Sequence, residues 1–175
     1  MDAITAMTSA STTHTRGAFS DLLHRHRGIV FKVANSYAWL AEDRDDLAQE
    51  IAAQLWHAFP KYDPARSFST WMYRVALNVA ISHVRSQSLR QRHDAVALDD
   101  DLHEVADTNA ADHEGEQHLR LLQRFIARQP PLDRALLLLY LEDRSQREIA
   151  EILGISESNV STKIGRLKER IHNQL

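Results

Sequence analysis

A row of polar and basic side chains near the C-terminus has the clearest capacity for chemistry. Val160, Ile164, Leu167 and Ile171 recur at three- and four-residue intervals, which predicts one helix with a single buried stripe. The other positions of that helix then carry hydroxyl, amide and cationic groups outward, and such groups bind base edges and phosphates. This spacing therefore predicts a DNA-reading helix. The outward residues are Ser158, Asn159, Ser161, Thr162, Lys163 and Arg166, with Ser156 at the helix start.

The segment before this helix has the pattern of a second, shorter helix. Ser145 and Glu148 match the S-x-x-E capping box, in which a serine oxygen and a glutamate carboxylate bind free amide groups at a helix start. Gly154 ends the short helix, because glycine best adopts the left-handed conformation, and Ser156 caps the next helix. Helix, short turn and helix together predict a helix-turn-helix, whose second helix lies in the major groove of DNA.

The rest of the chain predicts further helices that position this motif. Apolar residues recur at helical intervals upstream, and Asp45 and Asp46 suit the positive end of a helix dipole. Paired prolines at 60 and 64 and at 130 and 131 interrupt the pattern. No alternating pattern indicates a strand. The expected helices cover about 19–37, 45–59, 69–85, 119–129, 136–141, 146–153 and 156–171.

Charge divides the chain into three parts. Residues 1–85 carry nine Lys or Arg and eight Asp or Glu, residues 86–118 carry two and nine, and residues 119–175 carry ten and seven. The acidic middle has few large apolar residues and cannot bury enough surface to stay ordered, so it predicts a linker. This linker is either a solvated loop or a strand that imitates nucleic-acid charge inside a basic channel.

These patterns predict an all-α fold of two small helical domains joined by an acidic flexible linker. The N-terminal domain is a helical bundle, and the C-terminal domain contains the helix-turn-helix. The hydrophobic fraction of 43% is enough to build a core in each. The expected divisions are a flexible tail over 1–17, the bundle over 18–86, the linker over 87–117 and the helix-turn-helix domain over 118–175.

Composition argues against several classes of protein. The chain has no cysteine, which excludes disulfides and thiolate metal sites and fits a reducing cytoplasm. No stretch of about 18 apolar residues predicts a membrane span, and the N-terminus lacks the pattern of an export signal. The ten histidines are scattered, and no glycine-rich phosphate loop or nucleophile elbow is present. We therefore expect a cytoplasmic protein that is not an enzyme and needs no metal or cofactor.

Three stretches, in this order, resemble the extracytoplasmic-function sigma factors, the compact two-domain members of the sigma family. They are Asp45 to Glu50 with Leu55, Trp56 and Phe59, then Phe68 to Ala76 with Asn78 and Arg85, and finally Glu148 to Ser156. The resemblance extends from Phe19 to Leu175. It implies that the first stretch binds the polymerase clamp, that the second opens and reads the −10 element, and that the third belongs to the reader of the −35 element.

The resemblance assigns residues of the N-terminal domain to two partners. Those implied in polymerase binding are Asp45, Asp46, Leu47, Gln49, Glu50 and Trp56, and their charge would complement a basic polymerase surface. The plainer alternative is a solvated helix face. Those implied in −10 recognition are Lys61, Arg66, Ser67, Phe68, Trp71, Tyr73, Arg74, Asn78 and Arg85.

Aromatic side chains fit the implied opening of DNA, because stacking contributes about 1 to 3 kcal/mol per base and offsets the cost of unstacking the duplex. We expect Phe68 and Trp71 to belong to the core, whereas Tyr73 and Asn78 are better candidates for exposure. By the same resemblance, the loop over 61–67 could hold a flipped base, since its proline restricts the backbone.

The chain departs from the family pattern at two places. Ser82 replaces a frequent aspartate, and Ser158 to Lys163 replaces a frequent Gly-Thr-Val-Lys-Ser-Arg, which predicts an unusual promoter preference. The implied partners are core RNA polymerase through its clamp and flap, promoter DNA, and an anti-sigma factor. The rival function is a helix-turn-helix regulator that binds duplex operator DNA without polymerase.

Overall fold

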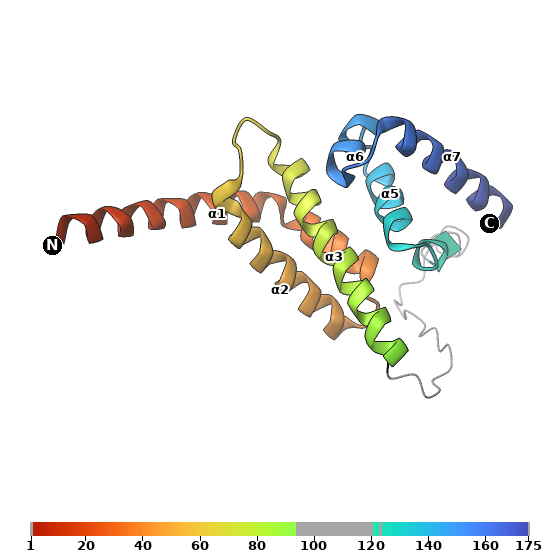
Figure 1. Ribbon diagram of the computed structural model, residues 1–175, viewed down its shortest axis with the longest axis horizontal. Helices are drawn as coiled ribbons and strands as arrows, with labels where there is room; N and C mark the ends of the chain where they lie inside the picture. The colour runs from red at the N-terminus through yellow and green to blue at the C-terminus, as the bar shows by residue number, and fades with distance from the viewer. Residues whose placement is uncertain (1, 94–120, 123, 175) are drawn as a thin grey trace, which may run out of the picture.

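The computed structural model describes residues 2–93, 121–122 and 124–174, and within these residues it contains helices and turns but no strand (Figure 1). The predicted all-α fold is confirmed. No helix among the described residues is apolar over enough length to cross a membrane. The helices are α1 (Asp2–Tyr37), α2 (Ala41–Ala58), the 3-10 turn η1 (Phe59–Lys61), α3 (Phe68–His93), α5 (Pro131–Leu141), α6 (Gln146–Leu153) and α7 (Glu157–Gln174).

The N-terminal bundle consists of α1, α2 and α3, each in contact with the other two. Burial of each large aliphatic side chain contributes about 1.5 to 3 kcal/mol, so the shared apolar face holds the three helices together. The side chains that are almost completely buried there include Val33, Leu47, Ile51, Leu55, Met72 and Leu77.

An aromatic cluster closes one end of this bundle, where η1 and the following loop join α2 to α3. Phe19 of α1 meets Trp56 edge-on at 5.2 Å and Phe59 at 5.0 Å between ring centroids. Phe68, the first residue of α3, lies 5.3 Å from Trp71. Edge-to-face pairs of this kind are favourable beyond the area that they bury. The cluster therefore fixes the loop over 62–67 against the bundle.

Several predicted boundaries differ from the structure. Helix α2 begins at Ala41 rather than near Asp45, so its first turn carries Glu42 and Asp43, and α5 begins at Pro131 rather than near Leu136. Helix α1 extends back to Asp2, so the structure has a helix over 2–17 where a tail was predicted, and no proline interrupts the alanine, serine and threonine residues there. Helix α3 continues to His93, so the first residues of the predicted linker are helical. That extension contains glutamine, leucine and arginine, which favour helix. The linker over 94–117 lies outside the described residues.

The C-terminal domain confirms the predicted helix-turn-helix. The Glu148 amide donates to the Ser145 hydroxyl oxygen at 3.2 Å, and the Ser145 amide donates to the Glu148 carboxylate at 3.0 Å, which completes the capping box. Gly154 takes the left-handed conformation at φ 68°, where a Cβ would be strained. Ser156 then accepts a hydrogen bond from the Asn159 amide at 3.2 Å. The core of this domain contains Leu136, Leu139, Ile149, Val160 and Leu167.

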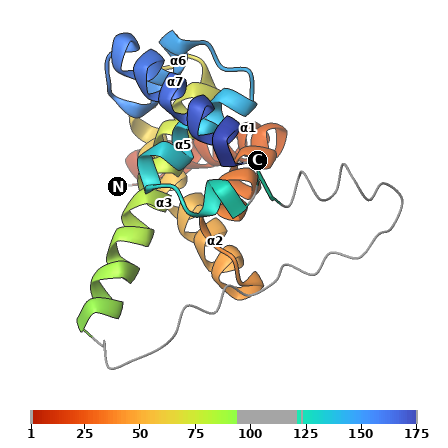
Figure 2. The same cartoon turned by 90° about the vertical axis from the view of Figure 1, so that its right-hand side faces the viewer.

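The two domains touch each other in this structure. Helices α5 and α6 contact α3, and α5 also contacts α1 (Figures 1 and 2). In Figure 1 the first turns of α1 project away from the bundle, on the side opposite the C-terminal domain. The C-terminal domain therefore lies against one side of the bundle, beside α3.

Candidate nucleic-acid and polymerase interfaces

Helix α7 presents the polar face that its sequence predicts. Val160, Ile164 and Leu167 are buried against α5 and α6, which turns the opposite side toward solvent. The predicted DNA-reading residues that are exposed there are Ser156, Ser158, Asn159, Ser161, Thr162 and Arg166. The Thr162 hydroxyl donates to the backbone oxygen of Ser158 at 2.9 Å, so its proton is already used and its lone pairs remain for a ligand.

The first turn of α5 fixes one flank of α7 through Asp133. Its two carboxylate oxygens lie 3.3 Å from the Lys163 ammonium and 3.1 Å from the Arg170 guanidinium, and the carboxylate is largely buried. On the other flank, the Lys168 ammonium lies 4.6 Å from the centre of the Tyr140 ring. Three cations of α7 thus engage α5, whereas exposed Arg166 lines a shallow hollow beside Asp133. Lys163 is only 31% exposed, so it faces outward less than predicted.

The aromatic residues implied in −10 recognition divide between core and surface. Phe68 is buried in the aromatic cluster, as expected, whereas Trp71 is only half-buried there and keeps part of its ring exposed. Sequence analysis missed Tyr62, whose ring lies 5.1 Å from Trp71 and whose hydroxyl donates to the backbone oxygen of Arg66 at 2.7 Å. The sequence feature that could have indicated Tyr62 is an aromatic residue in a loop bounded by prolines. Tyr62 therefore helps to fix the conformation of the loop over 62–67.

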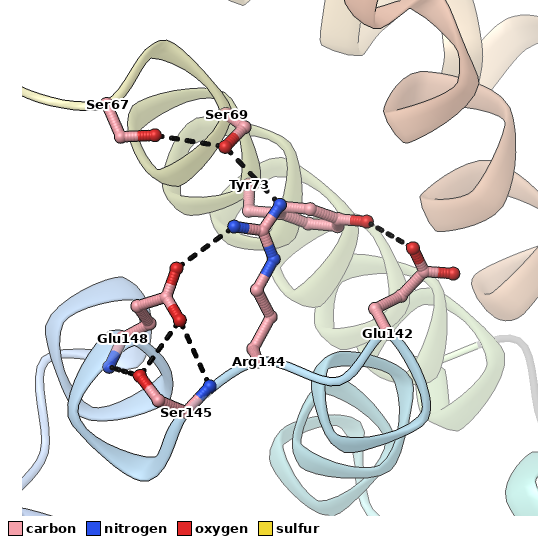
Figure 3. Close-up of polar contacts among 7 residues, drawn as sticks. All are labelled: Ser67, Ser69, Tyr73, Glu142, Arg144, Ser145 and Glu148. Atoms are coloured by element: carbon pink, nitrogen blue, oxygen red, sulfur yellow. Dashed lines mark hydrogen bonds and ion pairs between the residues drawn. The ribbon is translucent and has the colours of Figure 1, made fainter.

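Tyr73 is buried, and the expectation of exposure is wrong. Only 1% of its surface is accessible, because the turn between α5 and α6 covers it (Figure 3). The Arg144 guanidinium lies 5.2 Å from its ring centre, and its hydroxyl donates to the Glu142 carboxylate at 3.4 Å. Burial, and then the nearby Glu142 charge, raise the pKa of Tyr73 to about 12, so the phenol is neutral at pH 7.

The polar residues of the same group are mostly exposed. Asn78, for which exposure was expected, is exposed on α3 together with Arg74 and Arg85, and Lys61 is exposed at the end of η1. Arg66 is exposed but lies 3.4 Å from the Glu151 carboxylate of α6. Ser67 shares a hydrogen bond with Ser69 at 3.0 Å. The structure therefore places part of the implied −10 surface in solvent and part of it against the C-terminal domain.

Helix α2 carries the residues implied in polymerase binding on two different faces. Asp45, Asp46, Gln49 and Glu50 are exposed, and the Glu50 carboxylate lies 3.4 Å from His83 of α3. Leu47 is completely buried, so its predicted role as a surface contact is wrong, because its place in the apolar repeat directs it into the core. Trp56 is half-buried beside Phe19 and near Arg16, which leaves only part of its ring for a partner.

Comparison with known proteins defines the class. The family model for sigma-70 region 2 matches residues 22–90, and the model for sigma-70 region 4 matches residues 119–171. RNA polymerase sigma factor CnrH of Cupriavidus metallidurans is 30% identical over 97% of this chain and 93% of its own length. The ECF RNA polymerase sigma factor SigW of Bacillus subtilis is 28% identical over 90% of this chain and 89% of its own.

Solved structures agree on the fold. The structure of CnrH in complex with the cytosolic domain of CnrY superposes with a TM-score of 0.64 at 23% identity, covering 90% of this chain and 87% of that one. The structure of RpoE in complex with the anti-sigma factor NepR from Bartonella quintana superposes with a TM-score of 0.71 at 16% identity. The match covers 90% of this chain and 96% of that one.

The chain belongs to the extracytoplasmic-function group of the sigma-70 family. It is an RNA polymerase sigma factor, and the rival function as an independent operator-binding regulator is not favoured. The resemblance of the three sequence stretches is thereby confirmed.

Proposed function

We propose that this sigma factor reads the −35 element with the exposed face of α7. The observation that carries the proposal is the polar row on a helix held from both flanks by α5, through Asp133 and Tyr140. A helix fixed in this way enters the major groove with its reading side chains already oriented. We assign base or phosphate contacts to the exposed row, Ser156, Ser158, Asn159, Ser161, Thr162 and Arg166.

The −10 element is read and opened by the loop over 61–67 and by α3. Lys61 and Arg74, with Asn78 and Arg85, supply exposed groups for phosphates and bases. The aromatic cluster behind the loop supports it, and Tyr62 and Trp71 keep enough exposure to meet a displaced base. Contacts of this kind offset the free energy of unstacking, which amounts to a few kcal/mol per step.

The acidic face of α2 binds the polymerase clamp, through Asp45, Asp46, Gln49 and Glu50. Complementary charge accelerates encounter and fixes the register of binding. We expect the protein to act in the cytoplasm, without catalysing a reaction of its own. Two solved relatives are named in complexes with CnrY or with an anti-sigma factor, which supports an anti-sigma partner for this chain as well.

Run-off transcription with purified core polymerase on genomic fragments tests the proposal and finds the promoter at the same time. We expect the chain to bind core polymerase and to direct start-site-specific transcripts. Absence of both would overturn the proposal. Asp46→Ala together with Glu50→Ala should weaken polymerase binding, whereas Gln54→Ala, exposed on the same helix outside the proposed contact, should not. Unchanged affinity of the double variant would remove the two carboxylates from the contact surface.

A further inference from the structure

A histidine of α3 lies beside the acidic face of α2. The Nδ1 atom of His83 is 3.4 Å from Oε2 of the Glu50 carboxylate, and α2 and α3 pack directly against each other. The Glu50 side chain is 52% exposed, whereas the His83 side chain is only 21% exposed. The imidazole is therefore held by the packing of the two helices, and it has the more mobile carboxylate at its edge.

The second ring nitrogen of His83 lacks a partner in the fold. Its Nε2 atom is buried and makes no hydrogen bond among the described residues. Of the two neutral forms of the ring, the one with its proton on Nδ1 fits this environment, because that proton is attracted by the Glu50 carboxylate. The buried Nε2 is then an acceptor without a donor, which lowers the stability of the fold.

The pair with Glu50 does not offset this loss of stability. A pair that includes an exposed carboxylate contributes little, because water competes for the carboxylate. A buried nitrogen without a partner costs at least as much as such a pair contributes. The fold therefore gains little from an imidazole at position 83, whereas the orientation of the Glu50 carboxylate depends on it.

We propose that His83 is a positioning residue for polymerase binding, which holds the Glu50 carboxylate in the orientation that the polymerase receives. The inference rests on the proposed contact of Glu50 with the polymerase clamp. A free glutamate side chain occupies several rotamers, and ordering it on binding lowers affinity. His83 orders it in the free chain. Because the pair uses Oε2, a lysine or arginine of the partner can approach Oε1.

Affinity for purified core polymerase without DNA measures this effect. The DNA is left out because Arg85, implied in −10 contact, lies on the same helix. His83→Leu should weaken binding by about three- to tenfold, the range expected for ordering one long side chain. The variant should resist urea at least as well as the wild type, since leucine removes the unpaired nitrogen together with the pair. Such a loss of affinity without a loss of stability is not expected of a purely structural residue.

Two amide variants test which ring nitrogen matters, and they remain informative if the leucine variant folds poorly. The amide nitrogen of asparagine can take the place of Nδ1, whereas that of glutamine reaches the place of Nε2. His83→Asn should therefore keep a donor for Glu50 and bind polymerase within about twofold of the wild type. His83→Gln should bind as weakly as His83→Leu. Equal affinity of the asparagine and glutamine variants would overturn the inference.

A double-mutant cycle tests whether the effect acts through Glu50. In the Glu50→Ala background, His83→Leu should cause no further loss of affinity, because no carboxylate remains to be positioned. In the Asp45→Ala background the two losses should add, since Asp45 lies five residues earlier on α2. Additive losses in the Glu50 cycle would contradict the positioning role. His24→Leu removes an exposed histidine of α1 and is the control, which should leave affinity unchanged.

The tautomer of His83 provides a readout that does not require polymerase. Nitrogen chemical shifts of the imidazole rings, measured by NMR in mildly alkaline buffer, distinguish a proton on Nδ1 from one on Nε2. The signals of His83 are assigned by their absence from the His83→Asn spectrum. We expect the proton on Nδ1. A proton on Nε2 alone would refute the inference, because Nδ1 would then repel the carboxylate.

The same measurements separate this inference from the proposed function. If Glu50→Ala binds core polymerase as tightly as the wild type, the proposed clamp contact of Glu50 fails, and the positioning role fails with it. If Glu50→Ala weakens binding but His83→Leu does not, the positioning role alone is refuted and the clamp contact remains.

Discussion

The two domains differ in how their proposed DNA surfaces are held. In the C-terminal domain, Asp133 and Tyr140 of α5 contact cations on two sides of α7, and the polar face of α7 remains exposed to solvent. In the N-terminal domain, an aromatic cluster supports the loop over 62–67, while Tyr73 lies beneath Arg144 of the other domain. The polar row of α7 is exposed as it stands, whereas Tyr73 is buried at the contact between the two domains.

The largest expected effect tests whether the halves have separate cores. Leu167→Ala and Leu77→Ala each remove an almost completely buried side chain and should cost about 2 to 5 kcal/mol of unfolding free energy in their own domain. All three tryptophans lie in the N-terminal half, so their fluorescence reports that half alone. In Leu167→Ala, part of the helical signal in circular dichroism should therefore be lost under milder denaturing conditions than in the wild type. The midpoint of the fluorescence transition should not shift. A common shift in both signals would mean one cooperative unit.

A second prediction sharpens the roles of two cations on α7. Arg166→Ala should weaken −35 binding by about 1 to 3 kcal/mol if the side chain reads a base. Lys163→Ala should weaken it less, because its ammonium is held by Asp133. Promoter binding by the complete polymerase complex, with Arg147→Ala as control, measures both. An equal loss on every DNA sequence would reassign Arg166 to phosphate contact.

The capping box gives a smaller effect on the C-terminal half. Ser145→Ala should lower its unfolding free energy by about 0.5 to 2 kcal/mol, because the amide at the start of α6 loses its acceptor. Hydrogen bonds from Ser145 and then Arg144 hold the pKa of Glu148 below its ordinary value. Its stabilising contribution is present above the ordinary carboxyl pKa and is lost as pH falls through the lowered one.

Acid titration of stability checks that sign. The difference in unfolding free energy between the wild type and Glu148→Gln should shrink as pH falls into that range, since the protonated carboxyl then resembles the amide. A difference that grows on acidification would contradict the assigned pKa shift.

The smallest expected effect concerns the ion pairs between Asp133 of α5 and the cations of α7. Asp133→Asn should free Lys163 and Arg170 for phosphate, which should steepen the dependence of DNA binding on salt by about one unit for each cation that reaches the backbone. Affinity against salt concentration on promoter and unrelated DNA measures the change. An unaltered slope would show that the two cations stay where Asp133 holds them.

The sequence predicted most accurately the features that depend on residues close together along the chain. The capping box, the left-handed Gly154 and the stripe of α7 depend on neighbours within a few residues, and each is confirmed. Exposure of Tyr73 depends on Arg144, 71 positions away along the chain, so no local pattern could reveal it. The pairing of Lys163 with Asp133 could not be predicted for the same reason, because Asp133 belongs to another helix. The extension of α1 to Asp2 shows that a composition typical of loops does not by itself stop a helix.

Glu148 serves two separate structural purposes at once. The same carboxylate starts the first helix of the reading motif and positions the arginine that reaches the other domain. A substitution there is expected to weaken the start of α6 and to release the Arg144 side chain from its place against α3 at the same time.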